Sequence, residues 1–310
     1  MLGAAALLTK GQPARAGTMQ AVYPPARVGG TFDLLPFQPS INNYPAAVAH
    51  WNKTTGTTMT CWKLYYQESK FPTTLPLEPQ MQLMISQGIQ ALISFKPTPD
   101  INSPQGRSDK SQLGEAIQLL KANKLLAEVC LWQEVGPKDM KPGTYKDLVA
   151  FYAPVIRPHY PLVFDAPGYR GEKEWKRYKP DDSLMDGYAI DFYGGDFINH
   201  NITLDQFFPL AGSKPVGVWE IGNSASDKFT PSPADVNKYM NHIKDRLTAR
   251  LMSGLPVGSV AWFNGPAIPS QNGVNEMVGT HPSALAPTDI PLYRELYEAV
   301  NGKLPTTISA

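Results

Sequence analysis

The chain contains few of the side chains that bind metal ions. Its 310 residues include two cysteines and five histidines. Cys61 and Cys130 both lie in apolar runs, where a buried free thiol is the expected state and a disulfide is not indicated. The histidines show no HxH or HExxH spacing, and the cysteines are not at CxxC distance. We therefore expect no metal site.

Motifs that bind nucleotides or activate a serine are also missing. Neither GxGxxG nor GxxxxGK[ST] occurs, and Gly29-Gly30 opens an apolar run instead of closing one. The chain has no GxSxG elbow, although a Ser-His-Asp triad built without that motif stays open. These absences disfavour an open, doubly wound nucleotide-binding sheet, and we expect no cofactor.

Charge and hydropathy argue against two classes of partner. Lys and Arg total 28 against 27 Asp and Glu, which provides no charged field for nucleic acid or an anionic membrane. No run approaches the roughly 20 apolar residues that span a bilayer. We expect a soluble monomer that binds a neutral or mixed ligand.

The N-terminus resembles an export signal. Leu2–Leu8 is apolar, and the small-residue triplet Ala14-Arg15-Ala16 precedes Gly17, although a charged n-region is missing. We expect residues 1–17 to be a signal peptide or a disordered segment of a secreted protein. Because no linker or repeat interrupts the remainder, we expect residues 18–310 to form a single domain.

Short apolar runs alternate with amphipathic segments, which is typical of parallel β/α architecture. Each run is rich in β-branched, aromatic or leucine side chains. The sequence predicts eight strands, at Gly29–Leu35, Thr58–Tyr66, Ile89–Phe95, Leu125–Trp132, Leu162–Asp165, Gly187–Phe192, Val216–Glu220 and Ser259–Phe263. Eight strands favour a closed (β/α)8 TIM barrel.

Helices are predicted between the strands. The clearest is Pro233–Met252, because Ser232 provides an N-cap, Pro233 opens the helix and Gly254 follows its end. Residues 169–182 show only a weak helical pattern. The other predicted helices are Glu78–Gln87, Lys110–Lys121, Tyr145–Ile156 and Asp289–Val300.

Two glutamates stand at the ends of predicted strands. Glu134 follows the fourth strand and Glu220 ends the seventh, each close to a tryptophan. A charge at such a position is costly unless it lies in a polar mouth, and the carboxyl ends of barrel strands surround one shared mouth. A glutamate in a loop is more often a helix cap or a surface ion pair. Two of them at strand ends favour paired acid/base chemistry, as in glycoside hydrolysis.

The motifs around these glutamates resemble a known family. Lys214–Gly222 resembles the seventh strand of retaining clan A glycoside hydrolases, especially the mannanase-like family 26, where a Lys-Pro and an apolar run end in Glu-x-Gly. The resemblance implies that Glu220 is the nucleophile and that Tyr193, in a segment similar to the sixth strand, hydrogen-bonds it. Leu131–Glu134 is similar to the acid/base motif, which implies that Glu134 is the proton donor.

The acid/base motif departs from the family at two positions. Gln133 stands where clan A enzymes carry Asn or His, and Leu131 stands where family 26 members usually carry Arg. Gln133 can still donate an amide hydrogen bond to a sugar hydroxyl. We expect Glu134, beside Trp132, to have a raised pKa and Glu220 to stay ionised.

Further side chains are expected to bind sugar. Trp262 is the favoured stacking platform, since clan A enzymes often keep a tryptophan at the end of the eighth strand, whereas Trp219 should face away from the axis if Glu220 faces it. The expected substrate-binding residues are Tyr193, Trp262, Asp191, Gln133, Trp132 and Asn264. Other polar residues at predicted strand ends, each more often structural, are Asp33, Lys96, Asp165 and Tyr169.

The sequence thus predicts a retaining hydrolase of β-linked glycosides, with Glu134 and Glu220 across one open cleft at retaining distance. Two other functions stay open. The barrel could bind saccharide without cleaving it, or it could act on a small substrate that is not a sugar, because this fold supports many chemistries.

Overall fold

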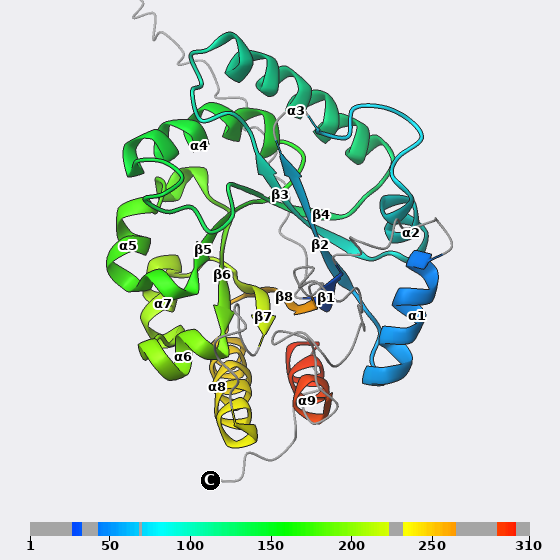
Figure 1. The fold of residues 1–310 in the computed structure, drawn as a ribbon, viewed down its shortest axis with the longest axis vertical. Helices are drawn as coiled ribbons and strands as arrows, with labels where there is room; N and C mark the ends of the chain where they lie inside the picture. The colour runs from blue at the N-terminus through cyan, green and yellow to red at the C-terminus, as the bar shows by residue number, and fades with distance from the viewer. Residues whose placement is uncertain (1–26, 33–42, 68–69, 223–231, 265–289, 302–310) are drawn as a thin grey trace, which may run out of the picture.

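The computed structural model describes residues 27–32, 43–67, 70–222, 232–264 and 290–301. Within them, eight parallel strands form one curled sheet in the order β1-β8-β7-β6-β5-β4-β3-β2 (Figure 1). The strands are β1 Val28–Phe32, β2 Cys61–Gln67, β3 Gln90–Lys96, β4 Ala127–Leu131, β5 Leu162–Pro167, β6 Gly187–Tyr193, β7 Val216–Gly222 and β8 Val257–Asn264. All eight predicted strands are therefore confirmed, with shifts at their ends.

Helices surround this sheet on its outer face (Figure 1). They are α1 Asn43–Thr55, α2 Pro79–Gln87, α3 Pro104–Ala122, α4 Pro142–Ile156, α5 Gly171–Tyr178, α6 Gly194–His200, α7 Leu204–Ala211, α8 Pro233–Met252 and α9 Ile290–Val300. None of these described helices is both long enough and apolar enough to cross a membrane. The arrangement is α/β, with an apolar core between the sheet and its helices.

The two ends of the strand order lie beside each other. Parallel ladders join each neighbouring pair from β1 through β8 and back to β2. Residues of β1 and β2 are in contact, although the described parts of the chain contain no ladder between them. The sheet is thus curled so far that its edge strands meet.

The helices agree with their caps. α8 has the predicted bounds, and the Ser232 side chain accepts a hydrogen bond from Asp235 N. α3 begins earlier than predicted because Ser103 caps it and Pro104 occupies its first position. The weak pattern at residues 169–182 contains the short helix α5, flanked by 3₁₀ turns at Gly168–Arg170 and Asp182–Leu184. α1, α6 and α7 were not predicted.

Inward-facing side chains form layers inside the curled sheet. The middle layer is apolar and consists of Cys61, Leu92, Cys130, Val163, Ala189, Trp219 and Ala261. Both cysteines are free and buried, as predicted. On the side of the strand N-termini, Gln90 Nε2 donates to Glu128 Oε1 and to Ser259 Oγ, at 3.0 Å for the latter. The opposite side, at the carboxyl ends of the strands, contains a larger group of charged side chains.

A β-bulge in β7 directs two consecutive side chains inward. Ile190 pairs with Val218, but the next residue of β6, Asp191, pairs with Glu220, so Trp219 is skipped. Trp219 is fully buried in the middle layer, and Glu220 lies directly above it among the charged residues. The prediction that Trp219 faces away from the axis is wrong, because the bulge breaks the alternation on which it rested.

Gly217 makes room for the inward-facing indole. A Cβ built at this position would lie 2.5 Å from Ser259 O and 3.1 Å from Trp219 Cδ1. The first distance involves backbone, which cannot move aside easily. The absence of a side chain at Gly217 is thus part of what allows Trp219 to fill the interior.

We predict that Gly217→Ala lowers the free energy of unfolding by about 1–3 kcal/mol, the usual cost of overpacking a core. Gly143→Ala is the matched control, because a Cβ at Gly143, in α4, meets nothing within 4 Å. That variant should be neutral or stabilising by up to about 1 kcal/mol. Urea denaturation of both variants measures the difference. Equal stabilities would contradict the close packing at Gly217.

Candidate active site

The carboxylate of Glu220 is held by three donors. Lys63 Nζ lies 2.7 Å from Oε1, and the Tyr65 hydroxyl donates to the same oxygen at 2.6 Å. The Tyr193 hydroxyl donates to Oε2. Glu220 is only 4% exposed. The hydrogen bond from Tyr193, which the sequence resemblance implies, is present, while the donors Lys63 and Tyr65 were not foreseen.

Lys63 is the centre of a buried ionic cluster. Besides Glu220, its ammonium contacts Asp165 Oδ2 at 3.0 Å and Asp191 Oδ1 at 2.9 Å. The side chains of Lys63, Asp165 and Asp191 are inaccessible to solvent. Three carboxyl groups from β5, β6 and β7 thus converge on one cation from β2.

The cluster sets the charge of each member. Burial alone would raise the pKa of Glu220, but the Lys63 ammonium and the hydrogen bonds from Lys63, Tyr193 and Tyr65 lower it below its ordinary value. Burial would lower the pKa of Lys63, and the surrounding carboxylates instead raise it well above its ordinary value. Lys63 therefore stays protonated and Glu220 stays ionised.

The two aspartates show the opposite behaviour. Burial raises the pKa of Asp191 well above its ordinary value, and the charges of Asp165 and Glu220 add to this rise. Burial likewise raises the pKa of Asp165, against the lowering effect of Lys63. One ammonium does not compensate three carboxylates in a dry environment, so both aspartates ionise less readily than usual.

Glu134 lies in the turn after β4. Its backbone has φ +52°, and that of Trp132 has φ +55°, a left-handed conformation that is uncommon for residues other than glycine. Such strain is typical of functional sites. The turn is fixed by hydrogen bonds from Trp132 N to Phe95 O at 2.9 Å and from Trp132 Nε1 to Pro97 O at 2.8 Å.

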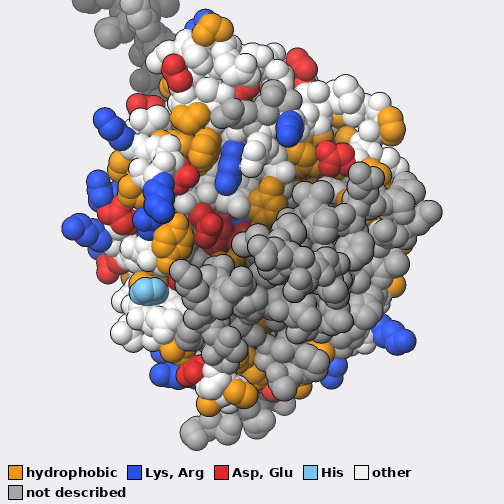
Figure 2. All heavy atoms as spheres, viewed as in Figure 1, with side chains coloured by type: hydrophobic (Ala, Val, Ile, Leu, Met, Phe, Trp, Pro, Cys, Tyr) orange, Lys and Arg blue, Asp and Glu red, His pale blue; other side chains and the backbone are white. Residues whose placement is uncertain are grey.

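The pKa of Glu134 is shifted in the opposite direction from that of Glu220. Burial raises the pKa of Glu134 to about 8, and the charge of Glu220 contributes to this rise, while Lys63 and Lys96 oppose it. Since the charge of Glu220 acts on Glu134, the two carboxyl groups lie near each other. The expected raised pKa of Glu134 agrees with this environment. Figure 2 shows acidic side chains near the middle of one face of the molecule, next to hydrophobic ones.

Several expected site residues lie near Glu134. Trp132 and Gln133 are half-buried, and Lys96 Nζ lies 5.9 Å from the centroid of the Trp132 ring. Among the described residues, Gln133 Oε1 has no hydrogen-bond partner. Tyr169 is 48% exposed. Partial burial raises the pKa of its phenol, and the charge of Glu134 adds to this rise. Trp132, Gln133 and Tyr169 therefore lie near Glu134.

Two expected residues have other positions, and two more are not described. Trp262 is fully buried and packs edge-on against Tyr293 of α9, so it faces the helix layer and cannot stack on a sugar. The alternation of β8 causes this, because Ala261 faces the interior. Asp191 is at the site but completely buried, with both oxygens on Lys63, so it supports the cluster instead of contacting substrate. The side chain of Asn264, at the end of β8, and Asp33 lie outside what the structure describes.

Lys63 and Tyr65 are the site residues that sequence reasoning missed. A signal was present, because Lys63 stands inside the apolar run Cys61–Tyr66 and shares the inward parity of Cys61. A lysine in a buried strand is rarely without carboxylate partners. The three carboxylates that it binds were all named from the sequence, but nothing in the sequence connected them to β2.

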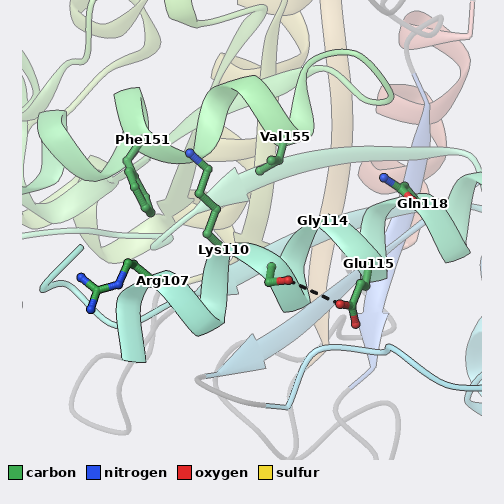
Figure 3. Close-up of a pocket in the computed structure, with 8 residues that line it drawn as sticks. Arg107, Lys110, Gly114, Glu115, Gln118, Phe151 and Val155 are labelled. Carbon is green, nitrogen blue, oxygen red and sulfur yellow. Dashed lines mark hydrogen bonds between the residues drawn. The ribbon is translucent and has the colours of Figure 1, made fainter. Parts of the chain in front are cut away.

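A second hollow lies on the outer surface, between α3 and α4 (Figure 3). There Lys110 Nζ lies 4.0 Å from the centroid of the Phe151 ring, and Ser111 Oγ donates to Glu115. Gly114 faces Val155 across it. This hollow belongs to the helix layer and contains a single carboxylate, so it lacks the paired groups of the site at Glu134 and Glu220.

Comparison with solved structures identifies related folds. Bacillus subtilis mannanase BCman aligns with a TM-score of 0.54 at 13% identity, over 86% of this chain and 84% of its own. A ruminal GH26 endo-β-1,4-mannanase aligns at 0.56 and 10% identity, over 90% of this chain and 63% of its own. The endo-β-1,4-glucanase Xac0029 of Xanthomonas axonopodis pv. citri aligns at 0.53 and 10% identity, over 88% and 99% respectively. No family model and no curated protein matches the sequence.

These similarities concern the fold. The resemblance to family 26 mannanases and related hydrolases, which the sequence motifs indicate, is confirmed at that level. Identities of 10–13% carry no residue roles with them.

We predict that the carboxyl of Glu134 titrates near pH 8, and that Glu220→Gln lowers this pKa because it removes a neighbouring negative charge. Carbon-13 NMR titration of glutamate-labelled protein measures both values, with Glu134→Gln assigning the signal. A Glu134 carboxyl that titrates at its ordinary value, or that does not respond to Glu220→Gln, would show that the two groups do not share a mouth.

Proposed function

We propose that the protein is a glycoside hydrolase that cleaves β-linked oligo- or polysaccharides with retention of configuration. The observation that carries this proposal is the opposite tuning of two carboxyl groups at one mouth, Glu134 with a raised pKa and Glu220 with a lowered one. A protonated acid beside an ionised carboxylate is the pair that glycoside hydrolysis requires. The fold shared with two mannanases and a glucanase supports the same class.

In the first step, Glu134 donates its proton to the glycosidic oxygen while the bond from that oxygen to the anomeric carbon breaks. Glu220 attacks the same carbon and forms a glycosyl ester. Oε1 of Glu220 already accepts from Lys63 and Tyr65, whereas Oε2 accepts from Tyr193. We therefore assign the attack to Oε2, which has the less occupied lone pairs.

In the second step, Glu134, now a carboxylate, takes a proton from water. The water oxygen attacks the anomeric carbon, and the bond to Oε2 of Glu220 breaks. Two inversions give net retention, which requires carboxyl groups roughly 5–5.5 Å apart. We propose this separation for Glu134 and Glu220, with Trp132, Gln133 and Tyr169 contacting the substrate.

We further propose that the curled sheet is a closed (β/α)8 barrel. The contact between β1 and β2 supports closure, as does the convergence of side chains from β2, β5, β6 and β7 on one point. Residues 1–17 lie outside the described residues, so export remains a proposal from their sequence. The monomeric state is likewise a proposal.

The charge state of Lys63 disfavours one chemistry for a substrate that is not a sugar. A lysine inside a barrel can form an imine with a carbonyl substrate, but only as a free amine. The carboxylates around Lys63 raise its pKa well above its ordinary value, which opposes that chemistry. Saccharide binding without cleavage is separated from hydrolysis by the following experiment.

We predict that wild-type protein turns over members of an aryl β-glycoside panel and that Glu220→Ala does not, because no nucleophile remains. Glu134→Gln should lower the rate about 10²–10⁴-fold on substrates with poor leaving groups. The loss should be much smaller on dinitrophenyl glycosides, whose leaving group needs no protonation. Glu115→Gln, in the hollow between α3 and α4, is the matched control and should keep full activity. Equal background rates for wild type and Glu220→Ala would instead identify a saccharide-binding protein.

The pH dependence of kcat/KM should be bell-shaped. Activity needs protonated Glu134, so it should fall as the pH rises through about 8. It also needs ionised Glu220, whose pKa is lowered, so the acid limb should lie below pH 4.5. The alkaline limb should disappear in Glu134→Gln when a dinitrophenyl glycoside is used. A wild-type rate that stays constant through pH 10 would contradict the role of Glu134.

A further inference from the structure

We propose that Lys63 is a positioning residue for this site: its ammonium, anchored by Asp165 and Asp191, holds Glu220 ionised and fixes the orientation of its carboxylate. The role is inferred from geometry within the described residues. It builds on the proposed function, because it concerns the same nucleophile, but the experiment below does not depend on turnover.

The first argument is the placement of the ammonium. Lys63 Nζ lies 2.7 Å from Glu220 Oε1, 3.0 Å from Asp165 Oδ2 and 2.9 Å from Asp191 Oδ1. A lysine ammonium has three donor hydrogens, and three carboxyl groups surround it. Every hydrogen is therefore directed to a carboxyl oxygen, so Nζ has one position and Oε1 of Glu220 is fixed relative to it.

The second argument is the absence of competing solvent. The Lys63 and Asp165 side chains are 0% exposed, and that of Glu220 is 6% exposed. Ion pairs are weak at the surface and strong where water is excluded. The influence of Lys63 on Glu220 is accordingly large, and bulk salt screens it little.

The third argument concerns the charges of the other groups around Glu220. Tyr65, on the same strand as Lys63, and Tyr193 donate hydroxyl hydrogens to Glu220 but carry no charge, because burial raises the pKa of both phenols well above the ordinary value. Glu134 faces the site as a neutral acid near neutral pH. Among the described groups around Glu220, Lys63 is therefore the cation in direct contact with it.

Asp165 and Asp191 have a distinct part in this arrangement. They compete with Glu220 for the ammonium, and their own charges oppose ionisation of Glu220. Burial raises the pKa of both aspartates, so they ionise less readily than Glu220 does. The thiol of Cys130 below them is neutral, since burial raises its pKa.

This role predicts shifts of opposite sign. Lys63→Met, which keeps the length of the side chain but removes the charge, should raise the pKa of the Glu220 carboxyl by about 1–3 units, the effect of losing an adjacent opposite charge. Asp191→Asn should lower the same pKa, because the ammonium then has one competitor fewer and Glu220 loses a like-charged neighbour. A group that only filled space would not produce this pair of results.

The measurement is carbon-13 NMR titration of glutamate-labelled protein, with Glu220→Gln assigning the signal. Lys244→Met is the matched control, since Lys244 pairs with Glu295 at the surface, and it should leave the pKa of Glu220 unchanged. If Lys63→Met does not fold, the direction of the shift in Asp191→Asn decides.

An unchanged Glu220 pKa in folded Lys63→Met would overturn the proposal, and so would a raised one in Asp191→Asn. These results are separable from the proposed function. Opposite shifts in a protein that hydrolyses no glycoside would support the role of Lys63 while refuting hydrolysis. Turnover with no such shifts would do the reverse.

Discussion

The buried ammonium of Lys63 is the interaction on which the site depends. A lone cation in a dry interior is strongly unfavourable, and it persists only with carboxylates close by. Asp165, Asp191 and Glu220 supply them from three consecutive strands, at 2.7–3.0 Å. Removing one partner of such a buried group typically costs about 3–5 kcal/mol. The cluster thus ties β2 to β5, β6 and β7 across the interior of the curled sheet, and it keeps the carboxylate of Glu220 charged.

The layer beneath the cluster makes this possible. Trp219 and the other apolar side chains of the middle layer lie between the ionic cluster and the polar group around Glu128. The cluster therefore rests on an apolar layer. Trp219 occupies this layer because of the bulge in β7 and the missing side chain at Gly217. The same bulge directs Glu220 to the mouth. One local irregularity therefore supplies both the floor of the site and its charged carboxylate.

The sequence predicts the scaffold and the two carboxyl groups, but not how they are held. Periodicity and turn residues are local signals, so the eight strands and α8 were found with nearly correct bounds. Glu220 and Glu134 stand out because a charge after an apolar strand is unusual. The inward orientation of Trp219 was mispredicted, since the bulge in β7 shifts parity without any mark in the sequence. The outward orientation of Trp262 was mispredicted because the sequence does not reveal which face of β8 points inward. The partners of Lys63 are at least 102 residues away in the chain, and such pairing arises only from the fold.

The most direct test of the central claim, that Glu220 is the nucleophile of a retaining glycosidase, is to trap the covalent intermediate. Wild-type protein would be incubated with dinitrophenyl 2-deoxy-2-fluoro-β-glycosides of gluco and manno configuration, and the labelled peptide identified by mass spectrometry. We predict one fluoroglycosyl group per chain, located on Glu220 and absent from Glu220→Gln. A label on another residue, or turnover of the parent glycosides with inverted first-formed products, would contradict the claim.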